Sequence, residues 1–346
     1  MKTFKLFLAL LLTVNFSYSQ RVDLDRYGFL VTYRELPAKP IGLDYKTYSV
    51  KTELGKYISS IFTYSNIVNQ LQFGGFTNVL ENGDLTFYFN CEDIAVLKTE
   101  VKNRVEETKD KDGKVTSRKT LYWFEIEYNL YAKYELLDNK KGGISIVSKV
   151  LDTRENKYVY KSSETGSYQS AKDAFQLNKD NIIKNLVVEK VNGYFQEINS
   201  HLTSQYGYPE YTTQTILWVI GSKKHQEFEK FNEVAANVKN AFKKMNASDP
   251  IDAIKDELQP SIDYFKGIIE RYNSSDKGDK KIRYAAYYNL ATIYFYLDNM
   301  DECIKYANLL ISNDYDTRDG KNLIKEAELQ KTLFEKNNIN TRHFPR

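Results

Sequence analysis

Apolar and polar side chains alternate over a long stretch in the first half of the chain. The apolar face consists of Tyr122, Phe124, Ile126, Tyr128, Leu130, Ala132, Tyr134 and Leu136. The opposite face carries charged residues such as Glu125 and Glu127. This period of two predicts a strand with one buried and one solvated face, as in an antiparallel sheet. Because Asp112-Gly113 favours a tight turn, we expect a long hairpin whose first strand covers residues 94–105.

Shorter apolar segments predict further strands on both sides of this hairpin. They cover residues 29–36, 45–50, 85–89, 144–151, 157–168 and 211–220. Residues 55–71 are expected to be partly helical, and residues 170–202 follow a 3.6-residue period that predicts one long helix. We therefore predict an α+β domain over residues 20–222, with a mostly antiparallel sheet covered by the long helix. The strand at 211–220 is expected to return to that sheet.

The pattern changes to helical after residue 222. The predicted helices cover residues 228–245, 251–272, 281–297, 301–312 and 320–336. The fold class is thus α+β, with an all-α domain over residues 223–346 whose last helix caps an exposed apolar face.

Aromatic and small residues recur at fixed spacing within these helices. In the hairpin of residues 283–315 they are Tyr287, Leu290, Ala291 and Tyr294, then Cys303, Ala307 and Leu310. In the preceding pair of helices they are Phe231, Val234, Ala235 and Val238, then Ser261, Ile262, Phe265 and Ile268. The last third of the chain therefore resembles tetratricopeptide-repeat proteins; a generic helical bundle is the alternative. The whole layout is similar to exported repeat-containing proteins of Gram-negative envelopes, which implies a scaffold or adaptor role without known catalytic residues.

The resemblance also implies a partner-binding surface on the first helix of each repeat. Asn289 falls where such repeats use an Asn to hold the backbone of a ligand, and Tyr288, Thr292 and Tyr296 flank it. We expect these four residues to bind a protein or peptide partner in the cell envelope. The Lys of a carboxylate clamp would fall at Ala285, so a clamp for a peptide carboxylate is not predicted. The alternative is that these residues make only structural or solvent contacts.

The N-terminus indicates export. A basic start at residues 1–5 precedes an apolar run at residues 6–14, and Ser17-Tyr18-Ser19 follows with small residues at a signal-peptidase site. The apolar run is shorter than the ~20 residues that span a bilayer. We therefore expect a signal peptide over residues 1–19, and a periplasmic or secreted protein that is not inserted in a membrane after cleavage.

The remaining chemistry favours binding over catalysis. The formal charge of +3 is too small to indicate nucleic acid as a partner. The three histidines are scattered and show no metal-ligand spacing, and no nucleophile or phosphate-loop motif is present. We therefore expect a non-catalytic protein without cofactor or metal. Because the chain has 28 tyrosines, an envelope glycan-binding protein that uses aromatic faces of the α+β domain is the alternative.

Overall fold

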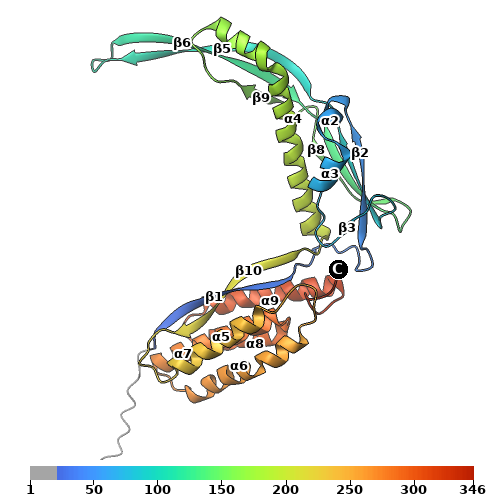
Figure 1. The fold of residues 1–346 in the computed structure, drawn as a ribbon. Coiled ribbons are helices and arrows are strands. Elements are labelled where there is room, and N and C mark those ends of the chain that lie inside the picture. The colour runs from blue at the N-terminus through green and yellow to red at the C-terminus, as the bar shows by residue number, and fades with distance from the viewer. Residues whose placement is uncertain (1–21) are drawn as a thin grey trace, which may run out of the picture. The chain divides into compact units, whose positions relative to one another are not determined.

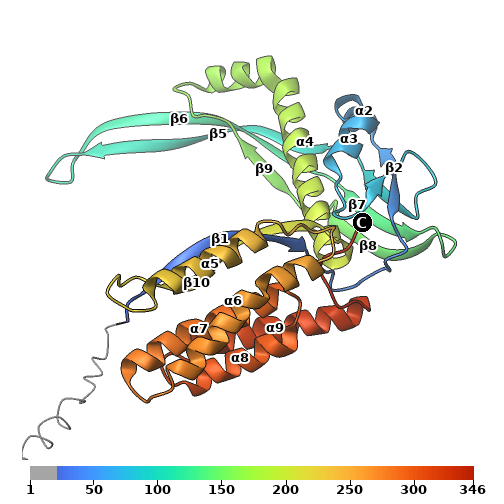
Figure 2. The same ribbon diagram turned by 60° about the horizontal axis from the view of Figure 1, so that its bottom comes forward.

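The computed structural model describes residues 22–346, which form two compact units (Figures 1 and 2). The helical unit contains residues 22–36 and 210–345; the sheet unit contains residues 37–209 together with Arg346. The chain is therefore α+β, as predicted. The units do not divide at residue 222 as we expected, because strands from both sides of the sheet unit join the helices. The predicted signal peptide, residues 1–19, lies outside the described residues.

The sheet unit is built on a five-stranded sheet of order β3-β2-β4-β7-β8. Its strands are β2 (Thr47–Leu54), β3 (Thr77–Asn78), β4 (Leu85–Cys91), β7 (Ala132–Asp138) and β8 (Ile144–Asp152). The predicted antiparallel pairing is correct for β4 with β7 and for β7 with β8. Strand β2, however, pairs in parallel with both β3 and β4. The cause is the helical crossover of α2 (Lys56–Ile61) and α3 (Tyr64–Gln70), which returns the chain in the same direction.

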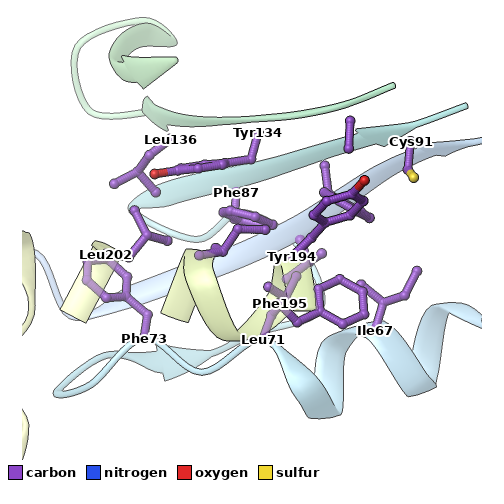
Figure 3. Packing of buried hydrophobic residues seen from close by; sticks show 14 of the residues in the cluster. Ile67, Leu71, Phe73, Phe87, Cys91, Tyr134, Leu136, Tyr194, Phe195 and Leu202 are labelled. Carbon is purple, nitrogen blue, oxygen red and sulfur yellow. The ribbon is translucent and has the colours of Figure 1, made fainter. Parts of the chain in front are cut away.

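The long helix α4 (Tyr168–Tyr206) covers this sheet, as predicted. Its C-terminal half buries an apolar stripe that includes Val191, Phe195 and Leu202 against sheet residues such as Phe87 and Tyr134 (Figure 3). The ring of Phe195 meets that of Phe89 at 5.2 Å between centroids. Because large aromatic side chains fill the space between helix and sheet, many of the tyrosines and phenylalanines serve as core.

A three-stranded sheet of order β5-β6-β9 forms the predicted hairpin. Strands β5 (Ala95–Lys109) and β6 (Val115–Asn129) pair on either side of the expected turn, and β9 (Tyr158–Lys161) pairs with the base of β6. The alternating stretch at 122–136 is not one strand, because the chain leaves β6 at Asn129 and begins β7 at Ala132. The alternation of burial continues across the break, so one periodic stretch serves two sheets.

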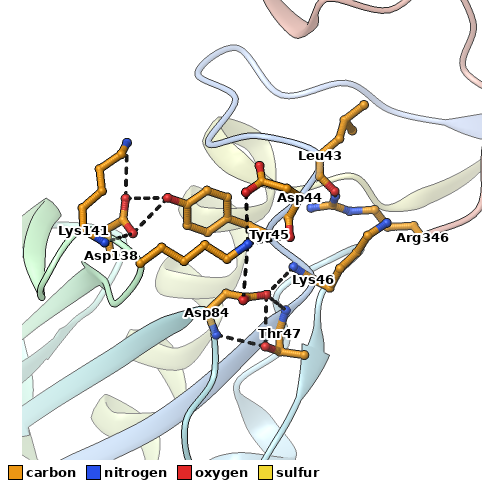
Figure 4. A network of polar contacts seen from close by, with 10 residues as sticks. Leu43, Asp44, Tyr45, Lys46, Thr47, Asp84, Asp138, Lys141 and Arg346 are labelled. Atoms are coloured by element: carbon orange, nitrogen blue, oxygen red, sulfur yellow. Dashed lines mark hydrogen bonds and ion pairs between the residues drawn. The ribbon is translucent and has the colours of Figure 1, made fainter.

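Carboxylates at the strand ends join the strands of the sheet unit. Asp84 accepts the backbone N–H groups of Lys46 at 2.7 Å and Thr47 at 3.0 Å (Figure 4). Asp138 accepts the hydroxyl of Tyr45 at 2.8 Å. These bonds tie the chain at the start of β2 to the residue that precedes β4 and to the last residue of β7.

Asp152 is the most fully buried of these carboxylates. It accepts the hydroxyl groups of Tyr194 at 2.6 Å and Tyr158 at 2.8 Å, and the amide of Asn156 at 2.8 Å. Burial alone would raise the pKa of Asp152, but these donors hold it below its ordinary value. The carboxylate therefore links the end of β8 to the middle of α4.

In the helical unit, β1 (Leu24–Arg34) and β10 (Glu210–Ile220) form an antiparallel two-stranded ribbon. The prediction that residues 211–220 form a strand is confirmed, but the expectation that this strand joins the larger sheet was wrong. It pairs along its whole length with β1, which begins earlier than residue 29. The region that we expected to be all-α therefore includes a β-ribbon.

The helices of this unit follow one another closely along the chain. They are α5 (Phe228–Phe242), α6 (Asp252–Arg271), α7 (Lys277–Tyr296), α8 (Met300–Ser312) and α9 (Arg318–Asn337), all near their predicted positions. Each packs on the next, and α7 also contacts α9. Gly320 permits the close approach of α9 to α8, since a Cβ there would lie 2.7 Å from the carbonyl oxygen of Ala307. Cys303 in this unit and Cys91 in the sheet unit are buried free thiols.

Asp152→Asn is expected to destabilise the sheet unit by about 2 kcal/mol, because the hydroxyl groups of the buried Tyr194 and the partly buried Tyr158 lose their charged acceptor. Chemical denaturation followed by far-ultraviolet circular dichroism measures the loss. The matched control is Asp180→Asn, at an exposed position on α4. An equal effect of the two substitutions would contradict the linking role of Asp152.

Candidate functional site

The candidate site lies along strand β10, and its first feature is the direction of the strand's backbone groups. The N–H of Gly221 donates to the carbonyl of Asp23 at 2.9 Å, which fixes the phase of the ladder with β1. In an antiparallel pair the backbone groups of alternate residues point away from the partner strand. Residues 212, 214, 216, 218 and 220 therefore present their N–H and C=O groups at the outer edge of β10.

Two asparagines from the helices bind this edge. Asn289 on α7 accepts the N–H of Trp218 at 2.8 Å and donates to its carbonyl at 2.8 Å. Asn232 on α5 accepts the N–H of Ile220 at 3.2 Å and donates to its carbonyl at 3.0 Å. Each carboxamide thus replaces one residue of a neighbouring strand. We call these two contacts the carboxamide clamp.

Aromatic packing holds the inner face of the ribbon on the same helices. Phe29 of β1 stacks on Phe242 of α5, with ring centroids 5.7 Å apart and an interplanar angle of 9°. Tyr33 meets Tyr296 of α7 at 6.1 Å, and Leu217 is fully buried. The face of α5 and α7 that carries the asparagines is therefore occupied by the chain's own ribbon.

A groove of about 570 Å³ remains open beside the ribbon, and we call it the β10 groove. The stretch 213–216 of β10 forms one wall. The other walls come from α7 and α9 and include Tyr288, Phe295, Tyr296, Glu326, Leu329 and Gln330. Leu329 is 62% exposed, so α9 presents a large apolar side chain to solvent at this place.

The chain's C-terminal segment contributes Arg342 to the lining of the β10 groove. Arg342 is almost fully buried, and its Nε donates to Asp298 Oδ1 at 2.6 Å. Its guanidinium carbon lies 4.3 Å from the ring centroid of Tyr33 and 4.8 Å from that of Phe295. A buried charge that is paired and covered by rings in this way is held in place. The backbone carbonyl of Arg342 also accepts the N–H of Arg34 at 3.0 Å, and this bond attaches the C-terminal segment to β1.

Unpaired polar groups remain in the groove. Glu35 and Glu326 form no ion pair with another described residue, and burial raises the pKa of each carboxyl above its ordinary value. The Nε2 atom of Gln330 is buried and meets no acceptor within residues 22–346. The groove is therefore acidic, and its wall contains one buried donor without a partner among the described residues.

The predicted partner-binding residues have different environments. Asn289 is fully buried and already engaged with β10, and Thr292 is buried beneath the same surface. Tyr288 and Tyr296 line the β10 groove, where burial raises the pKa of Tyr288 to about 12. Asn289 does hold a peptide backbone, but the backbone is the chain's own.

Sequence reasoning missed Asn232, Gln330 and the whole contribution of β10. Asn232 follows Phe231 at the start of an apolar helical stripe, and a second Asn near the position of Asn289 was a detectable signal. The β10 wall had no such signal, because it depends on pairing with a strand far away in the sequence.

Comparison with known proteins adds no relative: no protein-family model matches the chain, and no curated protein matches its sequence. Within the described part of the chain, no His, Cys, Asp and Glu side chains gather in a group of three or more that could hold a metal ion. Of the helices in residues 22–346, none is both long enough and apolar enough to cross a membrane.

Asn289→Ala is expected to lower the stability of the helical unit by about 2 kcal/mol. The substitution leaves the N–H and C=O groups of Trp218 covered by α7 but without hydrogen-bond partners. Thermal and urea unfolding, followed by tryptophan fluorescence, measure the change. Asn308→Ala, at an exposed position of α8, is the control. Equal stability of Asn289→Ala and the control would show that the carboxamide clamp contributes nothing.

The C-terminal segment is expected to be sensitive to acid through His343. Burial lowers the pKa of this imidazole below its ordinary value of about 6.5, although Asp298 lies 4.0 Å away. A histidine whose pKa is lowered on folding adds stability above its unfolded pKa, and that stability is lost as the pH falls below about 6.5. The melting temperature should therefore fall between pH 7.5 and pH 5.5.

The matched variant is His343→Asn, whose amide can still donate to the carbonyl of Asn246 as Nδ1 does at 2.7 Å. Its melting temperature should change less with pH over the same range. An unchanged slope would mean that His343 does not titrate as its burial indicates.

Proposed function

We propose that this protein is a non-catalytic adaptor that binds a protein or peptide partner in the β10 groove. The observation that carries the proposal is the groove itself. It combines an open strand edge, exposed apolar surface at Leu329 and the rings of Tyr288 and Tyr296. Apolar and aromatic surface with a few polar groups is the usual composition of a site that binds a polypeptide.

The repeat interpretation is part of this proposal. The positions with matching spacing in α5 and α7 are nearly all buried, among them Phe231, Ala235, Leu290 and Ala291. The second helices also bury the corresponding residues, with Phe265 against Phe231 at 5.2 Å between centroids. Tetratricopeptide-like hairpins of this kind support a scaffold role. Together with the signal-peptide pattern of residues 1–19, they support an adaptor that acts outside the cytoplasm.

The glycan-binding alternative has less support. It needs open aromatic faces on the sheet unit, and Trp123 is its natural candidate. One face of this ring is covered by the ammonium of Lys161 at 4.1 Å, and its Nε1 donates to Glu125 at 2.7 Å. The ring is thus engaged with its neighbours in the same sheet.

Leu329→Arg is expected to abolish partner binding, because it places a long cation in the open groove without disturbing a buried contact. The measurement is affinity capture from an envelope extract, with crosslinking and mass spectrometry to identify what is retained. Leu309→Arg, at a half-exposed position on α8 outside the groove, is the control and should capture as the wild type does. Capture that is equal for the wild type and Leu329→Arg would contradict the proposal.

A further inference from the structure

Only some of the backbone groups along the outer edge of β10 have hydrogen-bond partners. The carboxamide clamp binds Trp218 and Ile220, whereas the outward N–H and C=O groups of Gln214 and Ile216 have no partner among residues 22–346. Both residues line the β10 groove. An unpaired strand edge is a template for another strand, and proteins normally cover or blunt such an edge. This one opens into a groove that has room for a ligand.

The clamped and the free part of the β10 edge together define how long an added strand can be and which of its residues pair with β10. Outward groups recur at every second residue, about 7 Å apart, which is the repeat of an extended backbone. The clamp blocks the edge from Trp218 onward, so the free part extends from Thr212 to Ile216. A segment of about five extended residues matches this length.

The charge of the groove limits the side chains of such a segment. Glu326 on α9 and Glu35 after β1 are its unpaired charges, since Arg342 is already paired with Asp298. Both carboxylates reach solvent in the groove and form no ion pair with another described residue, and partial desolvation raises the pKa of each. A lysine or arginine from a ligand would supply that cation, and an apolar side chain beside it would cover Leu329.

We propose that the partner binds as an extended, basic polypeptide segment that adds a strand to β10 at Gln214 and Ile216 and places a cationic side chain at Glu326. This inference rests on the proposed function, because it names how and what the groove binds. The specificity comes from two sources. Backbone hydrogen bonds require an extended chain, and the carboxylates select a basic one over an acidic one.

The test uses three synthetic eight-residue peptides with a fluorescein label. The first alternates lysine and valine, and the second has glutamate in place of each lysine. The third repeats the first with N-methyl groups on consecutive central amides, so that both of its edges lose hydrogen-bond donors. Fluorescence anisotropy with the full chain measures binding. The wild type should bind the first peptide at least about tenfold more tightly than the other two, because each loses either the cation or the edge donors.

Protein variants test the same contact from the other side. Ile216→Pro removes an outward N–H without breaking the ladder to β1, and Ile216→Thr keeps that N–H. The proline variant should bind the lysine peptide about tenfold more weakly, and the threonine variant should bind like the wild type. Glu326→Gln should also weaken binding, whereas Glu328→Gln, on the same helix but outside the lining of the β10 groove, should not. Melting curves check that each variant is folded.

The inference is overturned if the wild type binds the lysine and glutamate peptides equally, or binds none of the three at millimolar concentration. It is also overturned if N-methylation has no effect, a result that does not depend on the folding of any variant. Capture that is lost in Leu329→Arg but retained in Ile216→Pro would keep the proposed function and reject strand addition. If both Leu329→Arg and Ile216→Pro retain capture, the proposed function and strand addition are both rejected.

Discussion

The helical unit depends on the way in which side-chain amides complete the edge of a strand. Within residues 22–346, strand β10 pairs with β1 alone, so half of its backbone groups need hydrogen bonds from elsewhere. Asn289 and Asn232 supply them at Trp218 and Ile220, and fix the ribbon on α7 and α5. A ribbon of two strands is marginal by itself in water, so these contacts and the rings beneath it stabilise the whole arrangement.

This constraint also explains why the unit boundary could not be predicted. Periodicity located the long hairpin, the covering helix α4 and the five later helices, because each pattern is local. The pairing of Thr32 with Thr212 joins residues 180 positions apart, and neither segment carries a signal for its partner. Similarly, the parallel pairing of β2 with β4 follows from a helical crossover between them, which strand patterns alone do not show.

The candidate site was predictable in part for the same reason. The resemblance to tetratricopeptide repeats implied that Asn289 holds the backbone of a ligand, with a structural contact as the alternative, and the structure shows a contact with the backbone of the chain itself. Tyr288 and Tyr296 do line an open groove, but its second wall, at Gln214 and Ile216, comes from β10. A surface that forms only when distant segments meet is beyond a reading of local patterns. We therefore view the ribbon as part of the binding surface that we propose, since it fills one portion of the helical face and provides a strand edge in the remainder.

The central claim is that the outer edge of β10 is clamped at one end and open at the other. Amide hydrogen exchange, resolved by residue with nuclear magnetic resonance, measures this directly. The account predicts slow exchange for the amides of Trp218 and Ile220. The amides that bond to β1, such as those of residues 217 and 219, should exchange slowly as well. The account predicts fast exchange for those of Gln214 and Ile216. Slow exchange along the whole edge, or fast exchange at Trp218 and Ile220, would contradict it.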